Sequence, residues 1–147
     1  MGVIAQQVQS ANLASNPSVI AKMSSGWAVL GDTQPLTGYC LLLADPIGAD
    51  LNALSPNHRK DFLSDMARLG DAIIQVTDCV RINYEILGNL VPELHAHLIP
   101  RYHDEPESIR TQPPMIAYDW QGARKSEPTG CDRAYIQALR EILLDQR

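Results

Sequence analysis

Short apolar runs separated by turn-forming residues dominate the first third of the chain. The runs at residues 19–23, 27–30 and 39–44 have the length and composition of β-strands, and the segments between them are rich in glycine, serine and proline. We therefore expect three strands in an antiparallel meander. Before them, apolar residues between positions 3 and 13 have partial helical spacing, which predicts a short helix that ends before Asn16-Pro17.

The clearest helical pattern follows the meander. Ser55 can cap the helix, Pro56 suits its first position, and apolar residues recur at helical spacing to about Cys79, so that one face packs on the sheet. Two further runs, 80–87 and 94–99, predict strands joined by a tight connection around Gly88.

The last third of the chain has a different composition. Prolines and charges dominate residues 104–128, which indicates an extended surface segment, and residues 134–144 offer a final apolar helical face. For Tyr118 and Trp120 we favour packing on their own domain over covering a partner or a nucleotide base. No repeat or linker divides the chain. We expect one α+β domain over residues 1–147.

Charge and cysteine content narrow the function. The formal net charge of −5 and pI of about 5.2 give no basic surface for a nucleic-acid polymer, so any nucleotide ligand is expected to be small. Three scattered cysteines favour a reducing compartment, and the cytoplasm is the default. No apolar run is long enough to span a bilayer, and we expect no membrane association.

Two of the four histidines lie in one short stretch. Residues 93–101 read ELHAHLIPR, so polar Glu93, His95 and His97 alternate with apolar residues. In a strand these three side chains share one face, while the opposite face is core. Imidazoles titrate near neutral pH and can act as nucleophiles or proton carriers, so this face is the candidate site.

The wider context of these histidines resembles a known family. Residues 81–89, RINYEILGN, run into Glu-x-His-x-His-x-x-Pro-Arg, and together they resemble the signature of the histidine-triad (HIT) superfamily. The resemblance covers about residues 17–103, the expected core of the domain, and leaves residues 104–147 as a C-terminal extension. The resemblance implies a five-stranded antiparallel sheet with a long helix on one face. It also implies a nucleotidyl hydrolase or transferase, usually a homodimer, that requires no cofactor or metal.

The same resemblance assigns roles within the stretch. His95 matches the nucleophile that attacks an α-phosphorus, and His97 matches the histidine that contacts phosphate oxygens. The family's first triad histidine is replaced by Glu93, although its backbone carbonyl, which in the family orients the nucleophile's ring, is retained. The Glu93 side chain either pairs with a Lys or Arg, or accepts a hydrogen bond from an imidazole and raises its pKa.

Three further residues are candidate substrate-binding groups. Asp32 resembles the residue that binds both ribose hydroxyls, Asn83 has a polar place near the phosphates, and Asn89 takes the position where the family often has a phosphate-binding Gln. Each also has an ordinary interpretation as a turn former or an exposed strand residue. The family's upstream histidine has no counterpart, since residues 45–48 read DPIG.

Several alternatives stay open. The predicted activity is hydrolysis of phosphoramidates or dinucleoside polyphosphates, and the main alternative is a nucleotide-binding module with little catalysis, which the loss of the first histidine favours. A zinc or iron site at Glu93, His95 and His97 is the third, although such a site usually needs another ligand. His103 lies where the strand is expected to fray, and His58 is expected to be exposed; neither is assigned a role.

Overall fold

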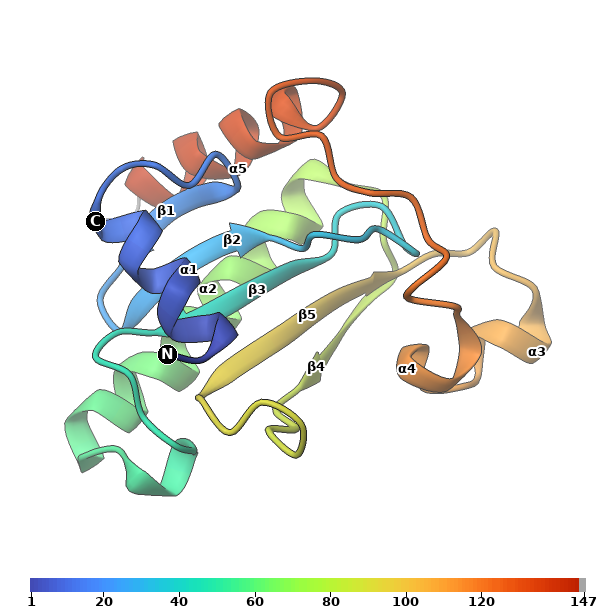
Figure 1. Ribbon diagram of the computed structural model, residues 1–147. Helices are drawn as coiled ribbons and strands as arrows, with labels where there is room; N and C mark the ends of the chain where they lie inside the picture. The colour runs from blue at the N-terminus through green and yellow to red at the C-terminus, as the bar shows by residue number, and fades with distance from the viewer. Residues whose placement is uncertain (146–147) are drawn as a thin grey trace.

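A five-stranded antiparallel sheet forms the centre of the computed structural model, which describes residues 1–145 (Figure 1). The strands are β1 (Val19–Met23), β2 (Gly26–Leu30), β3 (Cys40–Ala44), β4 (Arg81–Glu85) and β5 (His95–Arg101). Their order in the sheet is β1-β2-β3-β5-β4, so the histidine-bearing strand lies between β3 and β4. The predicted α+β architecture is confirmed.

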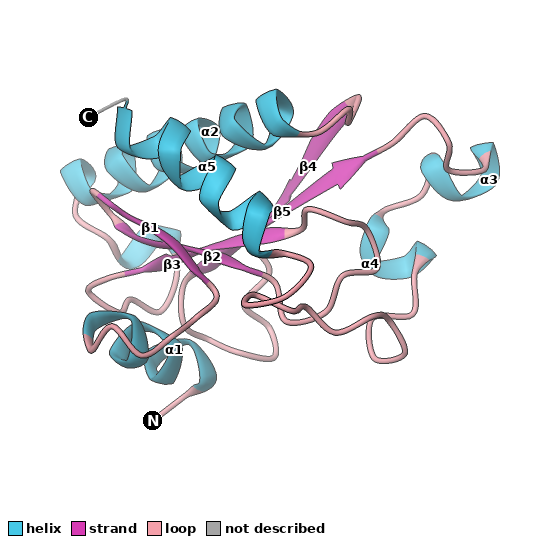
Figure 2. Ribbon diagram, turned by 90° about the horizontal axis from the view of Figure 1, so that it is seen from above, coloured by secondary structure: helices cyan, strands magenta, loops and turns pink. Residues whose placement is uncertain are grey.

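Helices cover both faces of this sheet unequally. The longer helices are α1 (Val3–Asn12), α2 (Pro56–Val76) and α5 (Arg133–Asp145), and the short ones are η1 (Leu51–Ala53), α3 (Glu107–Arg110) and α4 (Pro114–Ala117). Figure 2 shows α2 and α5 side by side on one face and α1 on the other. Ser55 caps α2 and Pro56 opens it, as the sequence predicted. No helix within residues 1–145 is long and apolar enough to cross a membrane.

The main core lies between the sheet and the pair α2 and α5. Leu94, Ala96 and Leu98 contribute to it, which confirms that they form the apolar side of the histidine strand. The opposite face carries two smaller clusters. One joins α1 to β2 and β3, and the other packs residues of the C-terminal segment on Tyr39 and Ile99. The histidine-bearing face is therefore flanked by α1 and by the C-terminal segment.

Asp65 on α2 fixes the turn between β1 and β2. The residue is 2% exposed, and Oδ2 accepts hydrogen bonds from Ser25 N at 2.8 Å and Ser25 Oγ at 2.7 Å, while Arg68 pairs with Oδ1 at 3.1 Å. His58 was expected to be exposed, but it is half-buried with Nε2 3.2 Å from the Ser25 carbonyl oxygen. The expectation was wrong because this turn folds back onto the first turn of α2.

Two predicted boundaries differ from the structure. The connection between β4 and β5 spans residues 86–94 and is a long loop, not a tight turn, although Gly88 adopts the left-handed φ of +71° that glycine favours. Strand β5 was predicted at residues 94–99 but spans residues 95–101. It continues through Arg101, which pairs with Arg81 in the ladder and is held by side-chain bonds described below.

Residues 104–128 were expected to form an extended surface segment, but they pack on the sheet. They contain α3 and α4, and Met115, Tyr118 and Trp120 contact the second small cluster. Backbone bonds fix the return of the chain, since Gln34 N donates to Arg124 O at 2.8 Å and Ser126 N donates to Asp32 O at 2.8 Å. The segment packs on the sheet instead of remaining extended because burial of its aromatic and apolar side chains is favourable.

Candidate functional site

The ring of His95 is held in one orientation by a local hydrogen bond. Its Nδ1 lies 2.6 Å from the backbone carbonyl oxygen of Glu93. A carbonyl oxygen can only accept, so Nδ1 carries the proton and, in the neutral ring, Nε2 carries the free lone pair. The residue is 8% exposed. An imidazole nitrogen with a free lone pair is a group that can act as a nucleophile.

His97 lies beside His95 on the same face. The ring centroids are 4.9 Å apart and the planes are inclined by 72°. Burial lowers the pKa of His97 to about 4, and the neighbouring His95 acts in the same direction. His97 is therefore neutral at physiological pH and can donate one hydrogen bond while accepting another.

Tyr39, which the sequence analysis did not single out, completes this pair. Its hydroxyl lies 2.6 Å from Nδ1 of His97, and the two rings are stacked with centroids 5.9 Å apart. Burial raises the pKa of Tyr39, so the hydroxyl keeps its proton. When this hydroxyl donates to Nδ1, the proton of neutral His97 is on Nε2. Tyr39, Leu41 and Leu43 are two positions apart, so in a strand their side chains share one face, which is the histidine face. This spacing was the signal in the sequence that could have identified Tyr39.

Trp120 brings the C-terminal segment to the site. Its ring meets Tyr39 edge-on at a centroid distance of 4.9 Å, and its indole N–H donates to the Pro114 carbonyl oxygen at 3.1 Å. Packing on its own domain, which the sequence analysis favoured, is thus confirmed. The extension beyond residue 104 supports the residue that contacts His97.

The Glu93 side chain has neither of its predicted roles. Its Oε1 accepts a hydrogen bond from Ala5 N at 3.4 Å, near the N-terminal end of α1. A Cβ added at Gly2 would lie 2.0 Å from this oxygen, so the carboxylate is packed against the start of the helix. The positive end of the helix dipole explains the preference for a carboxylate here. The Glu93, His95 and His97 metal site is not supported, because residues 1–145 contain no such group placed to hold a metal.

Glu85 is a second residue that the sequence analysis missed. Strand β4 pairs with β5 so that Glu85 lies directly opposite His97, and side chains of directly paired residues share one face. Its Oε2 is buried without a hydrogen-bond partner in the described part of the chain. Burial raises the pKa of Glu85, and Arg101 opposes this shift. Polar residues alternate along β4, which was the signal in the sequence.

Asn83, one step along β4, is on the same face and is fixed by Arg101. Its Oδ1 accepts from Arg101 Nη1 at 2.9 Å. Arg101 is 3% exposed, and its guanidinium also pairs with Glu105 at 3.0 Å and donates to two carbonyl oxygens of the C-terminal segment. The structure therefore places Asn83 on the histidine face, opposite Ile99, with its side chain already oriented.

Asp32 and Asn89 are less closely tied to the histidines. Asp32 is exposed in the turn after β2, and its charge adds to the effects of burial and Cys40 in raising the pKa of Tyr39. Asn89 is exposed in the 86–94 loop, and its side chain makes no hydrogen bond with residues 1–145. The structure thus places His95, His97 and Asn83 on one face of the sheet, turns the Glu93 side chain to α1, and leaves Asp32 and Asn89 at the periphery.

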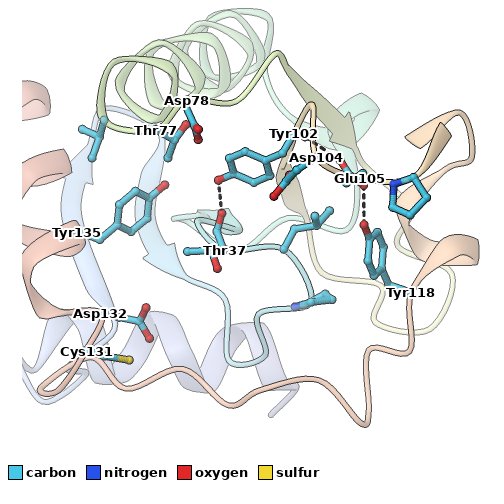
Figure 3. A pocket seen from close by; sticks show the side chains of 14 residues that line it. Thr37, Thr77, Asp78, Tyr102, Asp104, Glu105, Tyr118, Cys131, Asp132 and Tyr135 are labelled. Atoms are coloured by element: carbon cyan, nitrogen blue, oxygen red, sulfur yellow. Dashed lines mark hydrogen bonds between the residues drawn. The ribbon is translucent and has the colours of Figure 1, made fainter. Parts of the chain in front are cut away.

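Two cavities lie near this face of the molecule. The larger, of about 950 Å³, opens at the end of α2 and is lined by Tyr102, Tyr118 and Tyr135 together with acidic side chains (Figure 3). Within its wall, the Tyr102 hydroxyl donates a hydrogen bond to the Thr37 carbonyl oxygen, and the Tyr118 hydroxyl donates one to Glu105. The smaller, of about 500 Å³, lies over β4. Neither wall includes His95 or His97, and only the smaller includes Asn83 and Glu85.

Comparisons with known proteins agree on one family. The model of the HIT domain matches residues 15–104, more than half of the 147 residues. A histidine triad protein from Bradyrhizobium japonicum is 22% identical, with a TM-score of 0.71 over 84% of this chain and 87% of that one. A hypothetical histidine triad nucleotide-binding protein from Sulfolobus tokodaii is 12% identical, with a TM-score of 0.72 over 95% and 92%. A histidine triad protein from Marinobacter aquaeolei is 21% identical, with a TM-score of 0.70 over 92% and 94%. No curated protein matches.

Proposed function

Because the chain belongs to the HIT domain family, whose members are generally nucleotide-binding hydrolases and transferases, we propose that it cleaves small nucleotides at the α-phosphate. His95 acts as the nucleophile. The observation that carries this proposal is the hydrogen bond from His95 Nδ1 to the Glu93 carbonyl oxygen. The backbone supplies it, so replacement of the first triad histidine by glutamate leaves the orientation of the nucleophile in place.

The chemical steps follow from this tautomer. Nε2 of neutral His95 attacks the α-phosphorus; a P–N bond forms, and the bond to the leaving group breaks with its electron pair on that group, which takes up a proton. Water then attacks the phosphorus and breaks the P–N bond. The imidazole regains its lone pair, the nucleoside monophosphate departs with the hydroxyl of the water, and one proton is released.

His97 supports both steps by binding a non-bridging phosphate oxygen through Nε2–H. The lowered pKa keeps the ring neutral, and the Tyr39 hydroxyl holds the proton on Nε2 by donating to Nδ1. A single donor aimed at charge that develops in the transition state typically contributes about a hundred- to a thousandfold in rate. Asp32 is proposed to bind the ribose hydroxyls, and Asn83 and Asn89 to lie near the phosphates.

A panel of adenosine phosphoramidates, dinucleoside polyphosphates and nucleotide sugars tests the proposal. Substitution His95→Ala is expected to lower turnover by at least about a thousandfold, while exposed His103→Ala leaves it unchanged. Equal turnover in the wild type and His95→Ala would exclude His95 as nucleophile. Micromolar nucleotide binding by calorimetry without any turnover would select the alternative, a nucleotide-binding module.

We also propose that two copies of the chain pair through their sheets. The outer edge of β1 is covered, because Arg140 on α5 donates to the carbonyl oxygens of Val19 and Ile20. Strand β4 forms the other edge of the sheet and is the one available for pairing. Light scattering on a purified sample should give twice the chain mass of 16.2 kDa, and a value of one chain mass would contradict the proposal.

A further inference from the structure

The smaller cavity adjoins the site on the β4 side. Its wall includes Asn83 and Glu85, whose side chains share the sheet face of His97. The opposite wall is the connection from α3 to α4, residues 110–114. A volume of about 500 Å³ is within the range of small-molecule sites. The cavity is therefore large enough for a substrate group attached to a phosphate held at His97.

Two arginines in this wall are uncommitted. Arg81, on β4, is exposed, and Arg110, at the end of α3, is half-buried. Among residues 1–145 neither forms an ion pair or a side-chain hydrogen bond. Arg101 contrasts with them, because Glu105 neutralises it. The cavity thus presents two guanidinium groups able to bind a carboxylate or a phosphate.

The two ends of the cavity carry opposite charges. Glu85 lies opposite His97, and Arg81 lies four residues earlier in β4, which is about 13 Å along an extended strand. The end near the histidines therefore offers a hydrogen-bond acceptor, since Oε2 of Glu85 has no partner in the described chain. The far end carries the positively charged side chains of Arg81 and Arg110.

Sheet order shows which part of a substrate faces this cavity. The ribose candidate Asp32 follows β2, whereas β4 adjoins β5 on the opposite side from β3 and β2. With the nucleoside toward Asp32 and the phosphate at His95 and His97, the leaving group extends toward β4. A polyphosphate leaving group would place negative charge beside Glu85, whereas an amine leaving group would place an N–H there.

We propose that the cavity over β4 binds the leaving group and selects phosphoramidates whose amine carries an anionic group at its far end, held by Arg81 and Arg110. The inference rests on the proposed function, and names its substrate class. The N–H on phosphorus donates to Glu85, and the terminal carboxylate or phosphate pairs with the two arginines.

Matched substrates test the selection directly. Adenosine phosphoramidates of ε-aminocaproate and of its uncharged amide differ only in the terminal charge. A third, made from an aminoalkyl phosphate, tests phosphate as the anion. kcat/KM is measured for the wild type, R81Q, R110Q and the double variant, with R133Q as the control, since exposed Arg133 on α5 carries the same charge away from the cavity.

The wild type and R133Q are expected to prefer a charged substrate over the amide by about tenfold, and the double variant to have no preference. Either anion at the end of the amine supports the subsite. No preference in the wild type, or a preference that survives in the double variant, would overturn it. If turnover is absent, dissociation constants measured by calorimetry must show the same preference for the charged substrates over the amide in the wild type and R133Q, and its loss in the double variant. The nucleophile role of His95 is tested separately by the rate at which His95→Ala hydrolyses the uncharged amide, and a rate equal to that of the wild type would exclude the role.

Discussion

The Tyr39 hydroxyl lies 2.6 Å from Nδ1 of His97, so a tyrosine immediately before β3 contacts one ring nitrogen of that histidine and leaves the other, Nε2, for the proposed substrate. This contact joins the histidine strand to the C-terminal segment, because Trp120 packs edge-on against the same tyrosine. The extension beyond residue 104 is thus connected to the proposed chemistry through two aromatic rings.

Removing this hydroxyl tests its positioning role. In Tyr39→Phe we expect kcat to fall about tenfold with little change in KM, because the hydroxyl no longer holds the proton of His97 on Nε2. Steady-state kinetics with an adenosine phosphoramidate measures both constants. Tyr84→Phe is the control, since it removes a hydroxyl that faces Gly70 of α2 on the other side of the sheet. An unchanged kcat in Tyr39→Phe would refute the role.

His97 should make stability depend on pH in a defined window. Its folded pKa of about 4 is below its ordinary value of 6.5, so between these values the unfolded chain binds the proton more readily. The free energy of unfolding is therefore expected to decrease as pH falls from about 6.5 to about 4, by up to about 3 kcal/mol.

Urea unfolding across that range provides the measurement. His97→Asn should lack this component, and His103→Asn, at an exposed position, should retain it. Identical pH dependence in the wild type and His97→Asn would show that burial does not shift the histidine.

Glu93→Gln separates structure from catalysis. The carboxylate contacts the start of α1, whereas the backbone carbonyl orients His95. We expect the substitution to lower the free energy of unfolding by about 1 kcal/mol and to leave kcat nearly unchanged. Urea unfolding measures the change in the free energy of unfolding, and steady-state kinetics measures the change in kcat. A large loss of kcat with unchanged stability would place the carboxylate in the chemistry instead.

Asp65 is expected to be a major contributor to stability away from the site. Asp65→Ala leaves the buried Ser25 N–H and hydroxyl without their acceptor, and should cost about 3 kcal/mol in the free energy of unfolding. Asp71→Ala, at an exposed position of the same helix, should change it by less than about 0.5 kcal/mol. Equal effects of the two substitutions in chemical denaturation would disprove the assignment.

Local patterns were sufficient to predict the five strands, the three longer helices and the polar face of the histidine strand, but not the short helices η1, α3 and α4. Strand and helix periodicities depend on neighbouring residues, and the cap at Ser55 and the alternation through His95 and His97 are of this kind. The hydrogen bond from His95 to the Glu93 carbonyl is also local, because two residues of one strand make it.

The missed features depend on contacts between distant segments. Tyr39 meets His97 across 58 positions of sequence, and Glu85 becomes its neighbour only through strand register. The Glu93 side chain was misassigned because its partner, Ala5, is 88 positions away. Periodicity carries no information on pairing at such separations, so these residues needed the fold.

Isolation of a covalent intermediate tests the central claim most directly. After rapid acid-free denaturation of enzyme turning over an adenosine phosphoramidate, mass spectrometry of peptides should find the added nucleotidyl group on His95, bonded through phosphorus to nitrogen. The adduct should be absent from His95→Ala. A nucleotidyl group on His97 or another residue, or single-turnover hydrolysis by His95→Ala at the wild-type rate, would contradict the account.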